Sequence, residues 1–421
     1  MTGNAHAVLD VVIVGGGIAG NALATVLARG GKAVMVLEQS TVYQDRVRGE
    51  YVQPWGVAEM GRLGLDRVMA RAGGTHHTRF VPYDETIEPT EAEAATIALD
   101  HILPDVPGTL GVGHPQACEA LGQASSAAGA QIIRGVETVV VDLGRTPSVR
   151  YRVGGEEHVV RCRLVVGADG RASTVRQQAG MPLHATEPRL LGAGLLADGV
   201  QNWPQHQVAI GTEGDVVFFV LPQGEGRARL YLMYPVSQRR RFAGPGGPRA
   251  FLDAFALACI PGSDGIVRAR PAGPCATYPM NDTWTDHPVA EGLALIGDAA
   301  GYSDPHLGQG LSLAFRDVRH LSELLLGDPQ WSSRTLEPYA EERVERMRRL
   351  RFCNAVATTL RGEFGSEARE RRRRARERMQ GDSELALWRR ALLVGTDQVP
   401  STAFDDRVRQ RLFAPEATTG I

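Results

Sequence analysis

One glycine-rich turn near the amino terminus constrains the fold of this chain more than any other feature of its sequence. Residues 11–14 (VVIV) are apolar and β-branched, and they run directly into Gly15-Gly16-Gly17-Ile18-Ala19-Gly20. A helical pattern follows, and residues 33–38 then have the composition of a second buried strand. The chain therefore begins with a strand–helix–strand unit, which predicts an α/β fold with parallel strands.

The six-residue turn fits the pattern G-x-G-x-x-G, in which each glycine has a physical role. Gly15 allows the tight turn, Gly17 lets the backbone approach a pyrophosphate, and Gly20 permits close packing of helix on strand. The helix N-terminus adds partial positive charge. Glu38 ends the second strand about 20 residues on, where a carboxylate binds ribose hydroxyls. We therefore expect a dinucleotide, although this motif alone does not distinguish NAD from FAD. The other residues expected at this site are Ile18, Ala19 and Gln39.

Two further glycine turns follow apolar strands later in the chain. One is Gly167-Ala168-Asp169-Gly170, and the other is Gly297-Asp298-Ala299-Ala300-Gly301. Together with the first turn, and in this order, they make the sequence similar to the class A flavoprotein monooxygenases, the para-hydroxybenzoate hydroxylase-like family. The resemblance covers residues 1–50, 110–180 and 290–325. It implies that the dinucleotide is FAD.

The resemblance also implies roles for individual residues. Asp298, with Gly297, would bind the ribityl chain of FAD. Asp169 and Gly170 would support the region where FAD meets the pyridine nucleotide. Arg48 matches an arginine that reaches the cofactor near the flavin ring in many relatives, with a surface ion pair as the alternative role. An acidic turn residue can also cap its own backbone, so the three turns indicate FAD as a set rather than singly.

Residues 304–312 (DPHLGQGLS) resemble the family's proline–glycine loop beside the flavin ring. The helix that follows would point its N-terminus at the flavin N1–C2=O edge, where reduced flavin carries negative charge. Gly308 and Gly310 would let the backbone lie against the ring. His306 is a candidate base toward a phenol, with a structural role as the alternative. The other loop residues assigned to the ring or to catalysis are Pro305, Gln309 and Leu311.

One departure from the family pattern concerns the FAD phosphates. Relatives often carry R-x-x-L-x-x-x-L on the helix before the third strand, with the arginine at the phosphates. In this chain His114 stands where that arginine would be, and Gln116 lies two residues further on. We expect one of these two side chains, or backbone amides alone, to bind the phosphates.

The segments that carry the three turns are interleaved with segments of a different character. Residues 76–110 suit strands and exposed loops, and residues 185–285 alternate short strands with turns. We expect a discontinuous Rossmann-like FAD-binding domain (1–75, 106–184 and 288–330), a mainly antiparallel β-sheet substrate-binding domain (76–105 and 185–287) and a helical C-terminal region (331–421). Aromatic side chains of the sheet are candidates to line the substrate pocket, although such aromatics are also typical of plain core. The candidates are Phe218, Phe219, Tyr231, Tyr234, Tyr278 and Trp284.

The expected activity follows from the resemblance. No second G-x-G-x-x-G unit is present, so NAD(P)H is expected to visit transiently and reduce FAD. Dioxygen would then form a flavin C4a-hydroperoxide that hydroxylates or oxidises an aromatic or polyketide-like small molecule of secondary metabolism. A geranylgeranyl-type prenyl-chain reductase is the alternative. A flavin-dependent halogenase is less expected, because no W-x-W occurs and the single lysine, Lys32, lies in the first helix-to-strand turn. A non-catalytic flavin-binding protein has no positive feature behind it.

Composition argues against several other classes of protein. Forty-six basic against 48 acidic side chains give a net charge of −2, which argues against a nucleic-acid or membrane-surface partner. The arginine-rich run 369–378 is therefore expected to be a solvated helix with paired glutamates. The five scattered cysteines and the absence of metal-ligand spacings predict no metal. No segment has the length and apolarity of a membrane span. We expect a cytoplasmic monomer or homodimer.

Overall fold

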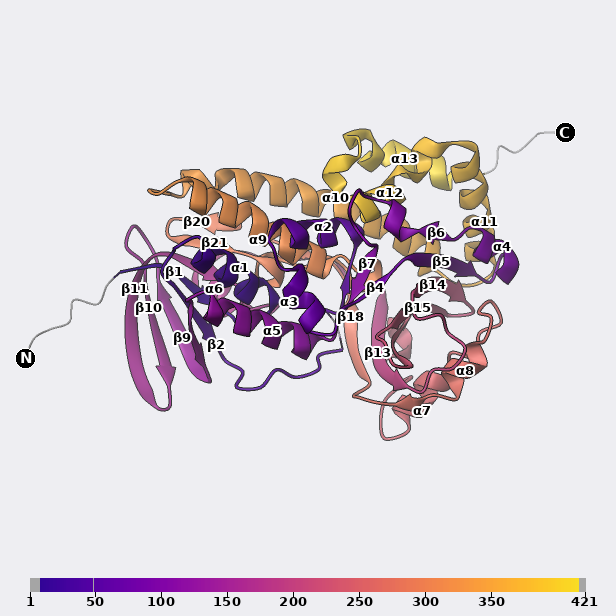
Figure 1. Cartoon of the computed structure of the whole chain (residues 1–421). Helices are drawn as coiled ribbons and strands as arrows, with labels where there is room; N and C mark the ends of the chain where they lie inside the picture. The colour runs from indigo at the N-terminus through magenta and orange to yellow at the C-terminus, as the bar shows by residue number, and fades with distance from the viewer. Residues whose placement is uncertain (1–7, 48, 416–421) are drawn as a thin grey trace, which may run out of the picture.

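The computed structural model describes residues 8–47 and 49–415 (Figure 1). Its first large sheet is built from the segments that carry the three glycine turns, in the order β20-β21-β11-β1-β2-β8. All neighbours in this order are parallel except β20, which pairs antiparallel with β21. The strands are β1 (Leu9–Val14), β2 (Val34–Glu38), β8 (Gln131–Arg134), β11 (Glu156–Gly167), β20 (Val289–Ala290) and β21 (Leu293–Leu295). The carboxyl ends of β1, β2, β11 and β21 therefore meet at one edge, where α/β sheets bind ligands.

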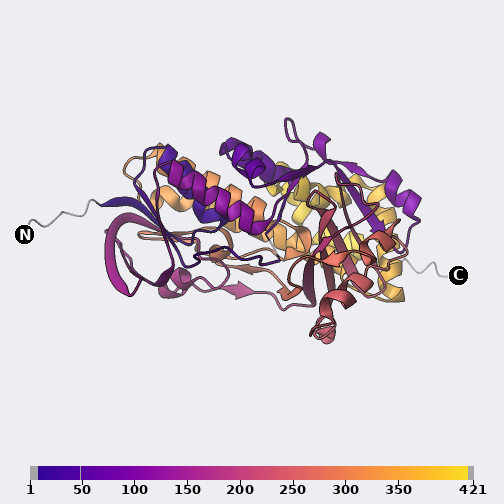
Figure 2. The same ribbon diagram turned by 60° about the horizontal axis from the view of Figure 1, so that its bottom comes forward.

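Three helices pack side by side on one face of this sheet (Figure 2). They are α1 (Ile18–Arg29), α5 (His114–Ala127) and α9 (Gly310–Gly327). Leu23 and Leu27 of α1 are fully buried there with Phe315 of α9. On the other side of the sheet, β11 continues into an antiparallel extension with β10 (Ser148–Val153) and β9 (Val136–Asp142). The short helix α6 (Thr174–Gln178) packs against β9.

The second large sheet has the order β17-β13-β16-β15-β14-β5-β6, with β18 paired to β13. Every pairing in it is antiparallel except that of β14 with β5. It therefore joins strands from two separate segments of the chain. The strands are β5 (Arg79–Asp84), β6 (Ile97–Ala98), β13 (Leu190–Asp198), β14 (Gln207–Glu213), β15 (Val216–Pro222), β16 (Arg227–Pro235), β17 (Arg270–Pro271) and β18 (Ala276–Met280). Helices α7 (Gly247–Asp253) and α8 (Ser263–Val267) cover the core beneath it.

Smaller elements connect the two sheets. Two short antiparallel sheets combine β3 (Tyr51–Val52), β7 (Thr109–Gly111) and β4 (Thr75–His77), and β12 (His184–Ala185) with β19 (Thr283–Trp284). Helices α2 (Pro54–Arg62) and α3 (Asp66–Arg71) precede β4. One more helix, α4 (Pro89–Ala94), lies in the segment for which only strands and loops were expected. Pro89 begins this helix at a position where its missing N–H costs nothing.

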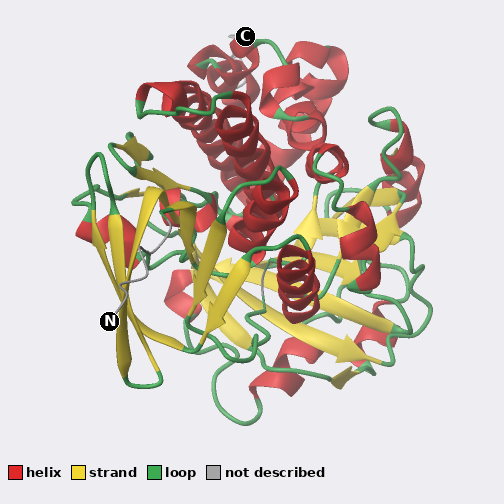
Figure 3. Ribbon diagram, turned by 60° about the vertical axis from the view of Figure 1, so that its left-hand side comes forward, coloured by secondary structure: helices red, strands yellow, loops and turns green. Residues whose placement is uncertain are grey.

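The C-terminal region is helical and packs around a hydrophobic cluster of its own. Its helices are α10 (Glu337–Arg361), α11 (Ser366–Gly381), α12 (Leu387–Val394) and α13 (Asp406–Phe413). In Figure 3 helices gather on the side of the molecule that carries the C-terminus, with strands below them. Within the described residues, no helix has the length and apolarity needed to cross a membrane.

The arginine-rich helix α11 is only partly the solvated helix that was expected. Arg373 is half exposed and pairs with Glu370 and Glu377 on its own helix, as expected. Arg372, in contrast, is buried and pairs with Asp84 at 3.2 Å across the helix–sheet contact. One face of α11 therefore packs against the carboxyl end of β5. The overall α/β architecture, with a mainly antiparallel second sheet and a helical C-terminal region, confirms the fold class.

Candidate functional site

One large cavity of about 1250 Å³ runs between the two sheets and the C-terminal helices. Its wall includes the carboxyl ends of β1, β2 and β11, the loop 302–311, strands of the second sheet and helix α12. Single-ligand pockets typically measure about 300–1,000 Å³. The cavity is therefore large enough for a dinucleotide and a second molecule.

The first glycine turn lies in the wall of this cavity. Gly15 has a φ of +104°, and a Cβ there would lie 2.4 Å from the backbone oxygen of Ala168. Gly17 has no atom within 4 Å of such a Cβ, so its outer side is open to the cavity. No side chain caps α1 and its first turn contains no acidic residue. The first amides of α1 are thus available to an anion, which fits a pyrophosphate.

Glu38 lies beside this turn and lines the cavity. Its Oε2 accepts a hydrogen bond from the Gly16 N–H at 2.6 Å, and its Oε1 accepts one from the Ser40 N–H at 2.7 Å. A carboxylate has about four acceptor positions, so Glu38 keeps capacity for ribose hydroxyls. The neighbouring cavity residues include Ile18, Ala19 and Gln39, whereas Gly20 lies in the packing between α1 and β1.

A buried ionic network stabilises the turn that carries Asp298. Asp298 and Gly297 belong to the 3-10 helix η3 (Gly297–Ala300) and line the cavity. The Arg343 guanidinium donates to the carbonyls of Gly297, Ala300 and Gly301, each at 2.9 Å. Arg343 also pairs with Asp317 at 3.0 Å, and Asp317 accepts from the Gly297 N–H at 2.8 Å. This network, which positions the turn, was not predicted from the sequence because its members lie far apart in the chain.

The turn at Asp169 combines a structural and a cavity-facing role. Asp169 accepts hydrogen bonds from the Ser173 hydroxyl at 2.5 Å and from the Thr174 N–H at 2.7 Å, so it caps the start of α6. It also lines the cavity with Gly170. Arg171, next in the chain, pairs with Asp298 at 3.3 Å and lies over the Tyr302 ring at 4.1 Å. The second and third glycine turns are therefore joined directly.

The loop 304–310 leads into α9 and lies on the cavity wall. Gly308 has a φ of +61°, and a Cβ there would lie 2.8 Å from Tyr51. Gly310 is open on the cavity side, and α9 begins without a capping side chain or an acidic residue. Pro305 and Leu311 also line the cavity. Gln309 does not, because it is buried and binds the Trp55 indole at 2.9 Å.

His306 is the most enclosed titratable residue of this loop. Its side chain is 3% exposed, and neither ring nitrogen has a hydrogen-bond partner among the described residues. Burial and the nearby Arg361 guanidinium lower the pKa of His306 to about 3. The ring is therefore neutral at physiological pH. It is better suited to hydrogen bonding with a ligand than to accepting a full proton.

Asp304 supports the same loop from behind. Its carboxylate accepts a hydrogen bond from the His306 N–H at 2.9 Å, while its own N–H donates to Asp282 at 2.9 Å. Burial, followed by the charge of Asp282, raises the pKa of Asp304 to about 7. The unfolded-state pKa is near 3.9. Protonation of the Asp304 carboxyl therefore stabilises the folded state fully below about pH 4, and this stabilisation is lost as pH rises through about 7.

This linkage predicts the effect of replacing Asp304 with asparagine, which keeps the acceptor oxygen but removes the titrating proton. We expect Asp304→Asn to be more stable than the parent at about pH 8, by on the order of 4 kcal/mol, and to differ little at about pH 4. Thermal unfolding across this range measures the effect. Asp253→Asn, at an exposed Arg249 pair, should follow the parent's pH profile. A parallel profile for Asp304→Asn would contradict the assignment.

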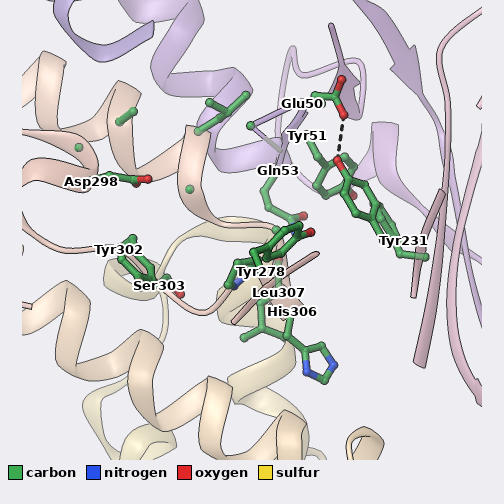
Figure 4. A pocket seen from close by; sticks show the side chains of 18 of the residues that line it. Glu50, Tyr51, Gln53, Tyr231, Tyr278, Asp298, Tyr302, Ser303, His306 and Leu307 are labelled. Atoms are coloured by element: carbon green, nitrogen blue, oxygen red, sulfur yellow. Dashed lines mark hydrogen bonds between the residues drawn. The ribbon is translucent and has the colours of Figure 1, made fainter. Parts of the chain in front are cut away.

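A second buried network faces the cavity from the strand β3 side (Figure 4). Glu50 accepts from the Tyr231 hydroxyl at 2.9 Å and pairs with Arg229 at 2.6 Å. Burial raises the pKa of Glu50, and the Arg229 charge opposes this shift. Figure 4 places Glu50 and His306 on opposite sides of Gln53 and Tyr278. Glu50 was not among the residues predicted from the sequence, although it lies only two positions after Arg48.

Three of the six aromatic candidates line the cavity: Phe219, Tyr231 and Tyr278. The other three do not. Phe218 and Tyr234 point to the opposite face of the sheet, into the core beneath α7, because neighbouring strand residues alternate in direction. Trp284 lies under the Arg351 guanidinium at 4.1 Å. The structure adds further aromatic residues to the wall. We call six of the aromatic residues in this wall the aromatic chamber: Tyr51, Phe80, Phe219, Tyr231, Tyr278 and Trp388.

Of the two residues expected near the FAD phosphates, only one lines the cavity. His114 starts α5 and lines the cavity beside Gly49. Gln116 is exposed and turns back toward Gly113, away from the cavity wall. Arg48 lies outside the described residues. His114 is thus the better placed of the two candidates on α5.

Comparison with sequence families and curated proteins is consistent with this geometry. Residues 8–351 match the model of a family described as "FAD binding domain". The 3-demethoxyubiquinol 3-hydroxylase of Escherichia coli is 32% identical over 333 residues, which are 75% of this chain and 79% of that protein. The squalene epoxidase erg1 of Aspergillus fumigatus is 26% identical over 379 residues, covering 86% of this chain and 76% of that protein.

Solved structures share the fold at low sequence identity. The flavin-dependent brominase Bmp2 has a TM-score of 0.75 with 16% identity, over 96% of this chain and 98% of its own. PqsL, a probable FAD-dependent monooxygenase from Pseudomonas aeruginosa, has a TM-score of 0.70 with 22% identity, over 84% of this chain and 96% of its own. Since these neighbours include both a halogenating and an oxygenating type, the fold alone does not select the reaction.

Proposed function

The chain belongs to the FAD-binding-domain family of class A flavoprotein monooxygenases, and we propose that it oxygenates an aromatic or polyketide-like small molecule held in the aromatic chamber. The observation that carries the proposal is that this chamber and the glycine turns open into the same cavity, with the loop 304–310 in its wall. A chamber lined by aromatic side chains favours a flat, apolar ligand body. NAD(P)H is proposed as the reductant.

The residues of this chain fit FAD in three places. The turn at Gly17 and the N-terminus of α1 would hold the pyrophosphate, with His114 nearby. Asp298 would hold the ribityl chain. The uncapped N-terminus of α9 would stabilise negative charge at the N1–C2=O edge of the ring. When bound, FAD supplies electron transfer from NAD(P)H and activation of dioxygen.

The protein's own contribution to the reaction is orientation and exclusion of water. The aromatic chamber keeps the reacting region dry, which strengthens every polar interaction inside it. The neutral His306 ring can accept or donate a hydrogen bond to a substrate hydroxyl, since its nitrogens have no other partner among the described residues. The Glu50–Tyr231 pair fixes one wall of the chamber.

Two alternatives on the same scaffold are weaker. A flavin-dependent halogenase needs an active-site lysine, as the family resemblance implies. Lys32, the only lysine, lies over the Trp331 ring at 4.8 Å and is not part of the cavity wall. A prenyl-chain reductase would also use an apolar chamber, and it differs in consuming no oxygen.

Oxygen uptake tests the proposal. The FAD-loaded protein is mixed with NADH or NADPH and a panel of aromatic and polyketide-like compounds, while NAD(P)H oxidation, oxygen uptake and peroxide release are followed. We expect at least one compound to increase NAD(P)H oxidation and to lower the peroxide released per NAD(P)H. Saturation of an isoprenoid double bond without oxygen uptake would instead support the reductase. Failure of NAD(P)H to reduce the bound flavin under any condition would contradict both.

A further inference from the structure

The end of the cavity away from β1 is enriched in arginine. Figure 1 shows α11, α12 and the end of β5 together on the side of the molecule opposite β1. Arg361, at the end of α10, and Arg389, on α12, line the cavity here. Trp388 of the aromatic chamber is the residue before Arg389. The arginines and the proposed substrate chamber are therefore parts of one wall.

Arg361 and Arg389 differ from the nearby Arg369, Arg372 and Arg376, whose guanidinium groups pair with Asp84 or Glu85. Among the described residues, neither guanidinium has a hydrogen bond or an ion pair. Burial, followed by the charge of Arg389, lowers the pKa of Arg361 to about 10. Burial, followed by the charge of Arg376, also lowers the pKa of Arg389. Both side chains are thus half-buried cations without an ion pair, and only Arg361 is offset in part by the more distant charge of Asp84, which is costly for the free protein.

The carboxylates nearby are already engaged. Asp84 is buried and lies 3.2 Å from Arg372 and 3.6 Å from Arg376. Glu85 pairs with Arg372 and with Arg369, the latter at 3.0 Å. At the rim, exposed Glu91 and exposed Arg390 also line the cavity and offset each other in charge. The two unpaired arginines therefore leave an excess of positive charge inside the chamber.

His306 adds a third polar group to the same place. His306 lines the same cavity as the two arginines, and the charge of Arg361 lowers the pKa of His306 as the charge of Arg389 lowers that of Arg361. The His306 ring nitrogens are buried and have no hydrogen-bond partner within the described part of the chain. Two guanidinium groups without an ion pair and one neutral imidazole without a hydrogen-bond partner supply the donors that a planar anion requires.

We propose that Arg361 and Arg389 bind a carboxylate of the substrate, so that the molecule oxygenated is an aromatic or polyketide-like acid. The inference rests on the proposed function, because it places the acid in the chamber assigned to substrate. A carboxylate fits better than the phosphates of NAD(P)H, because the arginines lie inside the wall next to Trp388. A carboxylate-binding site would also distinguish this chain from a protein whose substrate is a neutral lipid.

Paired ligands test the proposal without turnover. The probes are aryl carboxylates of increasing length, from benzoate to 4-phenylbutanoate and 8-phenyloctanoate, each with its neutral primary amide. Dissociation constants for the FAD-loaded protein are measured by equilibrium dialysis. A charge-assisted hydrogen bond leads us to expect at least one acid to bind about 10- to 100-fold more tightly than its amide. Arg361→Gln and Arg389→Gln should each remove most of that preference.

Two controls separate binding from folding. Arg373→Gln makes the same charge change on α11 outside the cavity, at an exposed pair with Glu370, and should keep the preference. Because Arg361 has no partner to lose, Arg361→Gln should retain its flavin and unfold at an equal or higher temperature than the parent. A structural role for Arg361 would instead lower the unfolding temperature and leave the acid–amide ratio unchanged.

Three results would overturn the inference. The first is a panel in which no acid binds better than its amide. The second is an unchanged acid preference in both Arg361→Gln and Arg389→Gln. The third is a loss of NAD(P)H affinity in these variants with ligand affinity intact, which would assign the arginines to the reductant. Since flavin content and reduction by NAD(P)H are measured on the same preparation, failure of the proposed function is detected separately.

Discussion

Gly17→Asp should abolish FAD binding while leaving the folded protein intact. Gly17 precedes α1 with φ −74° and ψ −163°, a conformation that any residue adopts, and a Cβ there meets no atom within 4 Å. Aspartate is a favourable residue at this helix position. Its carboxylate would, however, occupy the place proposed for the pyrophosphate, and like charges in contact cost several kcal/mol. We expect the dissociation constant of FAD to rise by about 100-fold or more.

Flavin content after gel filtration, fluorescence titration with FAD and thermal unfolding of the flavin-free protein measure this effect. Gly246→Asp is the matched control. Gly246 also precedes a helix, α7, and a Cβ there meets no atom within 4 Å. This variant should bind FAD like the parent and unfold at an equal or higher temperature. Normal FAD affinity in Gly17→Asp would show that the first glycine turn does not hold the cofactor.

Asp317→Ala should destabilise the protein by about 3–5 kcal/mol, the cost of leaving a buried charge without its partner. Asp317 is fully buried, and it pairs with Arg343 at 3.0 Å and with Arg346 at 2.8 Å. Its removal takes the only carboxylate partner from Arg343 among the described residues, one of two from Arg346, and the acceptor from the Gly297 N–H. The turn that carries Asp298 should loosen as a consequence. Urea unfolding measures the stability, and FAD titration measures the loosening.

An exposed carboxylate that also pairs with two arginines provides the comparison. Glu345 of α10 is 43% exposed and pairs with Arg348 and Arg349, each at 2.7 Å. Glu345→Ala also removes two ion pairs, but it should lower the free energy of unfolding by about 1 kcal/mol or less, because water screens exposed charges. Equal losses in Asp317→Ala and Glu345→Ala would contradict the assigned role of the buried network.

The parts of the fold that could be predicted from the sequence depend on local signals. An apolar run that stops at glycine is visible in the sequence at Gly15, Gly167 and Gly297, and parallel strands bring these turns to one edge of the sheet. The same holds for α5 and α9, whose apolar spacing indicates a helix. These signals require no knowledge of which distant segments meet.

The remaining site residues depend on contacts between distant segments. Phe218 and Phe219 are adjacent, and alternation predicts that they face opposite sides, but only the packing of α7 shows which side is core. Arg361 and Arg372 belong to one arginine-rich region. Arg372 forms an ion pair with Asp84, which lies 288 positions earlier in the chain, whereas Arg361 has no ion-pair partner in the described part of the chain. The composition of the region therefore does not distinguish the buried, paired Arg372 from the unpaired Arg361.

The origin of the oxygen atom in the product is the most direct test of the central claim. The FAD-loaded protein and NAD(P)H are incubated under isotopically labelled dioxygen with the compound that best stimulates NAD(P)H oxidation, and the product is analysed by mass spectrometry. A monooxygenase predicts one labelled oxygen atom in the product for each NAD(P)H consumed in the coupled reaction. An unlabelled product, or the same product formed in the absence of oxygen, would contradict it.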